Sequence, residues 1–142
     1  VYSEHGNNFV KTMLRLGAER DSLSVVDDQV GSPTYARNLA TTVWKLLQVW
    51  PESPILHYAD AGEISWYGFA EEIFVAAAVA GLVKTPPRLE RSSTSEYGAP
   101  APRPAYSVLD TSMTRSELDV SPPLWRDALC EMLERLTELP DN

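Results

Sequence analysis

Apolar residues recur at helical spacing in four stretches of this chain, each opened by a residue that can cap a helix or by a proline. These stretches predict helices that begin near Asn8, Thr34, Ser65 and Pro123. The residues expected on the buried faces are Phe9, Met13 and Leu16 in the first helix, Leu39, Val43, Leu46 and Leu47 in the second, Trp66, Phe69, Ala70, Ile73, Phe74 and Ala77 in the third, and Trp125, Ala128, Leu129, Met132, Leu133 and Leu136 in the fourth.

Short strands are expected between these helices at 23–26, 55–59, 88–91 and 107–109. The proline-rich stretch 97–104 cannot form a regular helix. Strands that alternate with helices favour an α/β arrangement, but these strands are too few for a complete doubly wound sheet.

Polar segments at the starts and ends of these elements carry a resemblance to a known family. The segments are Gly-Asn-Asn-Phe-Val-Lys-Thr-Met at 6–13, Asp-Gln-Val-Gly-Ser-Pro-Thr at 28–34, Ser-Trp-Tyr-Gly-Phe-Ala-Glu-Glu-Ile-Phe at 65–74, Thr-Ser-Glu-Tyr at 94–97, Arg-Pro-Ala-Tyr-Ser-Val-Leu-Asp at 103–110 and Leu-Trp-Arg-Asp-Ala-Leu at 124–129. In this order they resemble the C-terminal, substrate-binding half of dTDP-4-dehydrorhamnose reductases, which belong to the extended short-chain dehydrogenases. The resemblance runs nearly from end to end.

The resemblance implies a fold and an activity. Residues 1–142 would form a single α/β substrate-binding domain, a fragment of a longer chain whose Rossmann cofactor portion is missing. The full enzyme would reduce the C4 ketone of dTDP-4-dehydro-L-rhamnose with NADPH or NADH to give dTDP-L-rhamnose. Its expected partners are the dTDP-sugar and the missing N-terminal Rossmann domain.

The dehydrogenase machinery itself is absent from this sequence. None of the seven glycines falls in a Gly-x-x-Gly-x-x-Gly pattern, and no Tyr has a Lys four residues later. Without such glycines a backbone cannot approach a pyrophosphate closely. We therefore expect no catalytic residue and no bound cofactor in this fragment.

Composition narrows the other classes of function. A net charge of −8 argues against nucleic acid as a partner, because no dense Lys/Arg stripe is present. No apolar run approaches the roughly 20 residues of a membrane span, so a cytoplasmic setting is expected. His5 and His57 lack the Cys or carboxylate spacing of a zinc site, and no metal site is expected. Cys130 is interpreted as a small hydrophobe on a buried helix face.

Asn7 and Asn8 are the first candidate ligand contacts. They lie at a predicted helix start, where free N–H groups and the helix dipole favour a diphosphate, and their amides can donate to phosphate or sugar oxygens. N-capping explains one asparagine and leaves the second unused. We expect at least one of them to contact substrate.

Gln29, Gly31 and Thr34 surround the start of the second predicted helix. Gly31 before Ser32 and Pro33 suggests a turn in which the backbone comes close to another group. A plain loop before a capped helix is the alternative. The resemblance implies that the Gln-x-Gly-x-Pro-Thr pattern lines the pocket for the deoxysugar nucleotide.

Arg103 is the sharpest candidate, because it lies between Pro102 and Pro104 on a stiffened backbone. A planar guanidinium can bind phosphate in bidentate fashion. A surface ion pair is the competing interpretation. The resemblance matches Arg103 to a phosphate-facing Arg of related sugar-nucleotide enzymes.

Aromatic residues supply two further interpretations. The resemblance implies that Tyr2 lies beside the nicotinamide and the sugar, because the Trp-Val-Tyr stretch of the family does so. Trp66, Phe69 and Phe74 could form a stacking platform for thymine, although their helical spacing favours a place in the core.

Two alternatives stay open at the level of the sequence. The regulatory subunit of methionine adenosyltransferase is similar to the same family and is not an enzyme, and a reductase of another dTDP-deoxyhexulose would have the same motifs. Some members dimerise through magnesium held by two glutamates, at positions that here read Arg37 and Arg135. Two cations argue against that mode, although a homodimer of another kind stays open.

Overall fold

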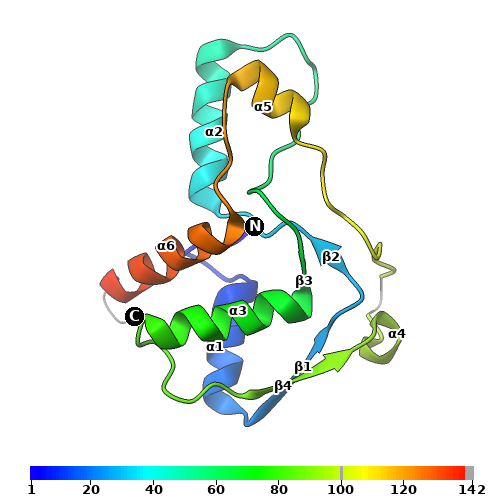
Figure 1. Cartoon of the computed structure of the whole chain (residues 1–142), viewed down its shortest axis with the longest axis vertical. Helices are drawn as coiled ribbons and strands as arrows, with labels where there is room; N and C mark the ends of the chain where they lie inside the picture. The colour runs from blue at the N-terminus through cyan, green and yellow to red at the C-terminus, as the bar shows by residue number, and fades with distance from the viewer. Residues whose placement is uncertain (100, 140–142) are drawn as a thin grey trace.

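The computed structural model describes residues 1–99 and 101–139 (Figure 1). Helices and strands alternate along most of the chain. In order they are α1 (Phe9–Glu19), β1 (Ser22–Val26), β2 (Val30–Gly31), α2 (Ala36–Val49), β3 (Ile64–Ser65), α3 (Trp66–Val79), β4 (Arg88–Ser92), α4 (Thr94–Tyr97), α5 (Ser112–Leu118) and α6 (Trp125–Glu138). None of the helices in the described ranges is long and apolar enough to cross a membrane.

The strands form two small sheets. β1 and β4 are parallel, with Val26 opposite Ser92 at their carboxyl ends, whereas β2 and β3 form a short antiparallel pair. The predicted α/β class and the shortage of strands are both confirmed over the described part of the chain. Because β1 and β4 are parallel, the loops that follow them, at 27–29 and 93–94, emerge at the same edge.

The hydrophobic core lies where α1, α3 and α6 pack together. The predicted faces of α3 and α6 supply most of it, including Ile73, Leu129, Met132 and Leu133, which are fully buried. Gly17 allows the close approach of α1 to α3, because a Cβ there would lie 2.5 Å from Phe74. The periodic pattern thus predicted this core correctly.

On α3 and α6, two residues assigned to the buried faces lie at the surface. Trp66 is 42% exposed at the first turn of α3, and the Cys130 side chain is exposed on α6. Helical spacing places both near the edge of an apolar stripe, where the position of the neighbouring element decides exposure. The prediction that Cys130 is buried was wrong.

Helix α2 departs most from its predicted role. It lies at one end of the molecule beside α5 (Figure 1), and its predicted core residues Val43 and Leu47 are exposed. Thr34 does not cap the helix. The N-cap is Tyr35, whose N–H donates to the buried Asp60 carboxylate at 2.8 Å, so a distant residue provides the acceptor expected from Thr34.

Two predicted strands are not formed in the described part of the chain. Residues 55–59 have no strand partner, and residues 107–109 form no strand, although a single bridge joins Val30 to the neighbouring Tyr106. A strand needs a neighbour for its N–H and C=O groups. The local sequence alone therefore mispredicted both segments.

Candidate functional site

A cleft of about 900 Å³ opens between α1, β1, the start of α3 and the segment from β4 to Arg103. Its wall combines aromatic, apolar and polar side chains, among them Phe9, Met13, Gln29, Trp66, Tyr97 and Arg103. A smaller hollow of about 480 Å³ lies between the end of α1 and residues 82–87, and its lining includes none of the predicted ligand residues. Volume and composition favour the larger cleft as a ligand site.

Arg103 lies in the wall of this cleft with an exposed side chain. None of the ion pairs found among the described residues involves its guanidinium. Within the described residues, the competing interpretation of Arg103 as a surface ion pair therefore does not apply. Its five N–H donors can serve an anion in the cleft.

Gln29 lines the same cleft but is only 7% exposed. Its Nε2 donates to Thr94 Oγ1 at 2.9 Å, and its backbone C=O accepts from Trp66 N–H at 3.3 Å. The side-chain donor of Gln29 thus binds the first residue of α4.

Asp28 belongs to the same edge and was not among the predicted site residues. Its carboxylate accepts the Thr94 N–H at 2.9 and 3.0 Å and the Thr94 hydroxyl at 2.6 Å. These hydrogen bonds lower the pKa of Asp28 below its ordinary value. The available signal was the position of the acid: Asp28 follows a strand whose parallel neighbour leads into the capping sequence Ser93-Thr94-Ser95-Glu96.

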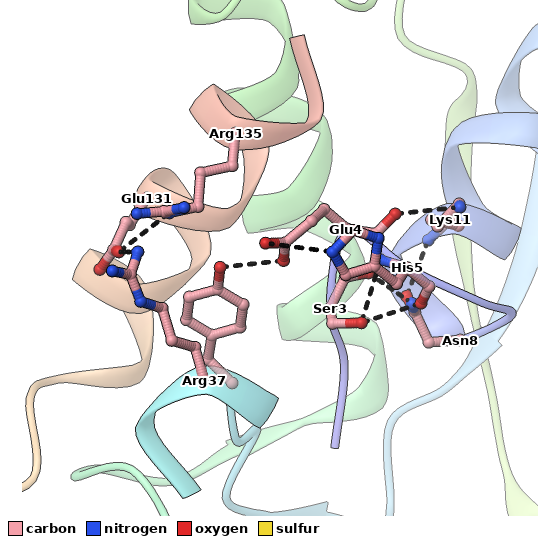
Figure 2. Close-up of polar contacts among 9 residues, drawn as sticks. Ser3, Glu4, His5, Asn8, Lys11, Arg37, Glu131 and Arg135 are labelled. Carbon is pink, nitrogen blue, oxygen red and sulfur yellow. Dashed lines mark hydrogen bonds and ion pairs between the residues drawn. The ribbon is translucent and has the colours of Figure 1, made fainter. Parts of the chain in front are cut away.

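Asn8 and Asn7 have different surroundings, as Figure 2 shows for Asn8. Asn8 Oδ1 accepts from the Lys11 N–H at 3.2 Å, which caps α1, and its Nδ2 donates to the Ser3 C=O at 2.7 Å. Asn7 is exposed at the start of the helix. Both polar atoms of the Asn8 amide are therefore engaged, Oδ1 with Lys11 and Nδ2 with Ser3. The side-chain amide of Asn7 has no hydrogen-bond partner among the described residues.

The remaining predicted residues lie apart from the cleft lining. Tyr2 is buried and stacked on Tyr35 with ring centroids 5.8 Å apart, and its hydroxyl donates to the Trp125 C=O at 3.3 Å. Burial raises the pKa of Tyr2 far above its ordinary value. Tyr2 thus packs as a core residue within the described chain.

Gly31 and Thr34 also have packing partners. A Cβ on Gly31 would lie 3.1 Å from Ser107 Oγ, so the small residue allows the 105–107 segment to approach. Thr34 is buried, and its hydroxyl donates to the Ser32 C=O at 3.1 Å. The structure therefore brings Gln29 and Arg103 together around one cleft, with Asn8 beside its lining residue Phe9, and places Tyr2, Gly31 and Thr34 in supporting layers.

The three aromatic residues considered for stacking separate into two groups. Phe69 and Phe74 are buried in the core, as their spacing predicts. Trp66 lines the cleft beside Phe9, with ring centroids 4.7 Å apart and planes tilted by 54°. This pair provides an aromatic surface that a planar base can contact.

Arg37 and Arg135 both contact Glu131 (Figure 2). Arg37 Nη1 lies 2.9 Å and Arg135 Nε 3.3 Å from the same carboxylate oxygen, on partly exposed side chains. Across 1–99 and 101–139, no three His, Cys, Asp or Glu side chains form a group that could hold a metal. Two arginines on one carboxylate leave no open oxygen cage for magnesium at this place.

The fold and the cleft together define the C-terminal, substrate-binding portion of an extended short-chain dehydrogenase. A model of the family described as the RmlD substrate binding domain matches residues 1–138, and the chain belongs to this family. The resemblance found in the sequence is confirmed.

The comparisons with known proteins agree on this assignment. The chain is 40% identical over 141 residues to the spore coat polysaccharide biosynthesis protein SpsK of Bacillus subtilis, covering 99% of the chain and 47% of that protein. It is 37% identical to a dTDP-4-dehydrorhamnose reductase of Aggregatibacter actinomycetemcomitans, covering 91% of the chain and 46% of the relative.

A solved structure gives the same picture. The dTDP-4-dehydrorhamnose reductase of Bacillus anthracis, crystallised in complex with NADP, superposes with a TM-score of 0.85 at 38% identity. The match covers 94% of this chain and 45% of that one. The chain thus spans slightly less than half the length of these relatives.

Proposed function

We propose that this chain is the substrate-binding part of an NAD(P)H-dependent dTDP-4-dehydrorhamnose reductase, which converts dTDP-4-dehydro-L-rhamnose to dTDP-L-rhamnose. The observation that carries the proposal is the convergence of Arg103, Gln29 and the Phe9–Trp66 pair on one cleft of about 900 Å³. A cleft with a cation, an amide and an aromatic surface suits a nucleoside diphosphate sugar.

Each wall of the cleft has a distinct part in this proposal. Arg103 holds the diphosphate through bidentate, charge-assisted hydrogen bonds. The Phe9–Trp66 pair takes the thymine ring. Asn7, which is exposed outside the cleft lining and two residues before Phe9, donates its amide to a phosphate or sugar oxygen of the ligand. These contacts fix the orientation of the sugar so that its C4 ketone faces outward from the cleft.

The dinucleotide cofactor does not fit the residues of this chain. The segment after β1 carries the acidic residue Asp28, and the segment after its parallel neighbour β4 begins α4. The Asp28 carboxylate accepts the first N–H of α4, so this N–H is not free. A pyrophosphate at that helix start would meet a negative charge instead of free N–H groups. We infer that the nicotinamide cofactor, which supplies the hydride, is held by another part of the enzyme.

The exposed apolar side of α2 suggests where that other part docks. Trp44 and Trp50 are 67% and 77% exposed, and Val43, Leu47 and Ile55 are exposed as well. Residues 55–59, predicted as a strand, have no strand partner among the described residues. The chain matches less than half the length of its relatives. We infer that a sheet of the cofactor-binding half, in the part of the enzyme outside this match, would cover α2 and pair with 55–59.

The chain alone is expected to bind dTDP and not to oxidise NADPH when dTDP-4-dehydrorhamnose is added. Binding of dTDP is expected because the chain contains the cleft. NADPH oxidation is not expected because the chain lacks both a glycine-rich cofactor-binding motif and a Tyr-x-x-x-Lys pair. Calorimetric titration with dTDP and absorbance at the NADPH band measure the two. Absence of dTDP binding, or turnover above background, would contradict the proposal.

Asn7 and Asn8 should separate ligand binding from stability. Asn8→Ala removes the N-cap of α1 and the contact to Ser3, so we expect the free energy of unfolding to fall by about 1 kcal/mol. Asn7→Ala should change it by less than about 0.5 kcal/mol while lowering the affinity for dTDP severalfold. Urea unfolding and dTDP titration check the pair, and a stability loss at Asn7 equal to that at Asn8 would refute the separation.

A further inference from the structure

One wall of the cleft is a segment that few hydrogen bonds join to the rest of the described chain. This segment, residues 93–99 and 101–104, is called the strap below; it contains α4 and contributes Glu96, Tyr97, Ala99 and Arg103 to the lining. Beyond its far end, Val30 N–H donates to the Ala105 C=O at 2.8 Å. Its near end is joined to the body by the end of β4 and by Thr94.

Thr94 is held by two residues of the loop after β1. Its hydroxyl donates to Asp28 at 2.6 Å and accepts from Gln29 Nε2 at 2.9 Å, and its N–H donates to the same Asp28 carboxylate. Donating and accepting at once fixes the orientation of the hydroxyl. The contact exists because the parallel pairing of β1 and β4 brings both loops to one edge.

Helix α4 is held at its first residue by this contact. It has only four residues, and helices of that length are not stable without help because nucleation is costly. Its Ser93–Glu96 capping box ties the first turn to itself, whereas Asp28 ties the turn to the body of the domain. A carboxylate at the start of a helix is also electrostatically favourable.

We propose that Asp28 is a positioning residue: by holding Thr94 it fixes the strap as a wall of the cleft and keeps Tyr97 and Arg103 in place for the diphosphate sugar. This rests on the proposed function, since the ligand is the one assigned there. Gln29 then acts on the ligand largely through Thr94, because its side-chain donor is already engaged. Tyr97, which is exposed beside the cleft, gains a place in its wall only while α4 is held.

The test compares variants that keep or remove the Thr94 hydroxyl. Thr94→Val has nearly the same shape and loses the hydroxyl, whereas Thr94→Ser keeps it; Asp28→Asn weakens the acceptor. Asp110→Asn is the matched control, because Asp110 also accepts a backbone N–H at a helix start, from Ser112 at 2.9 Å, but lies outside the cleft lining. Amide hydrogen exchange at 94–98 and titration with dTDP are the two measurements.

Thr94→Val and Asp28→Asn are expected to speed amide exchange across α4 by about tenfold or more and to weaken dTDP binding by about five- to tenfold. Thr94→Ser and Asp110→Asn should stay close to wild type in both measurements. If Asp28 and Thr94 contributed only to global stability, Thr94→Val and Asp28→Asn would not speed exchange in α4 more than elsewhere and would not weaken dTDP binding.

Two results would overturn the proposal while leaving the function intact. Unchanged exchange in Thr94→Val would show that Asp28 and Gln29 do not hold the strap. Faster exchange with unchanged dTDP affinity would show that the strap does not position the ligand. If the wild type itself fails to bind dTDP, the proposed function fails, and the role of Asp28 in ligand binding fails with it.

Discussion

Arg103→Ala is expected to weaken use of the dTDP-sugar by about ten- to a hundredfold, with the cofactor unaffected. Loss of a charge-assisted contact to phosphate costs about 1.5–3 kcal/mol, which corresponds to that range. Arg103 is exposed in the cleft wall and forms no ion pair with any described residue, so its charge is available to a ligand. Steady-state kinetics of the complete enzyme, with both substrates varied, measures the effect.

Two further variants sharpen the Arg103 experiment. Arg103→Lys should recover only part of the loss, because an ammonium keeps the charge without the planar fork. Arg88→Ala is the matched control, since Arg88 pairs with Glu90 at 2.6 Å on the exposed side of β4 and lies outside the cleft lining. An unchanged specificity constant for the dTDP-sugar, or an equal loss in NADPH binding, would show that Arg103 does not hold the diphosphate.

Asp60→Ala should be the most destabilising of the substitutions considered, with a loss of about 3 kcal/mol in the free energy of unfolding. Asp60 is 2% exposed, and its carboxylate accepts from the Tyr35 N–H at 2.8 Å, from Asn38 Nδ2 at 3.2 Å and from the Tyr58 hydroxyl at 3.0 Å. The substitution leaves these donors in a buried place without an acceptor. It also removes the residue that joins the start of α2 to the segment before β3.

Urea unfolding with two comparison variants tests this role. Asp60→Asn keeps the volume and one acceptor oxygen, so a smaller loss of roughly 2 kcal/mol is expected. Asp21→Asn, at an exposed carboxylate, should be near neutral. Equal stability of Asp60→Ala and wild type would mean that water or another group satisfies the three donors.

The contribution of Asp60 should also depend on pH. Burial outweighs the three hydrogen bonds and raises the pKa of this carboxyl above its ordinary value. The folded protein therefore binds the proton more tightly than the unfolded chain does. The stability from this group is complete below about pH 3.9 and declines as the pH rises through the folded pKa. The stability difference between wild type and Asp60→Asn should accordingly shrink as the pH rises above about 4.

Part of the candidate site could be predicted from residue chemistry. Arg103 stood out because prolines flank it, and Asn8 because a helix pattern follows it. The sequence did not indicate that both amide atoms of Asn8 would form hydrogen bonds within the chain, to Ser3 and Lys11, or that Gln29 would donate to Thr94. These partners come from hydrogen-bond competition within the folded chain, which residue type alone does not specify.

The sequence by itself determined the elements in which spacing and capping agree. The α1, α3 and α6 helices follow directly from apolar periodicity and from cap residues such as Asn8 and Ser65, and the short strands β1 and β4 lie where strands were expected. Only the tertiary structure decided which apolar faces are covered, because periodicity shows that a face exists and not what packs against it. It left Val43 and Leu47 of α2 exposed and residues 55–59 without a strand partner in the described chain. The parallel pairing of β1 with β4 likewise brought Asp28 to Thr94, a contact between residues 66 positions apart that no local pattern encodes.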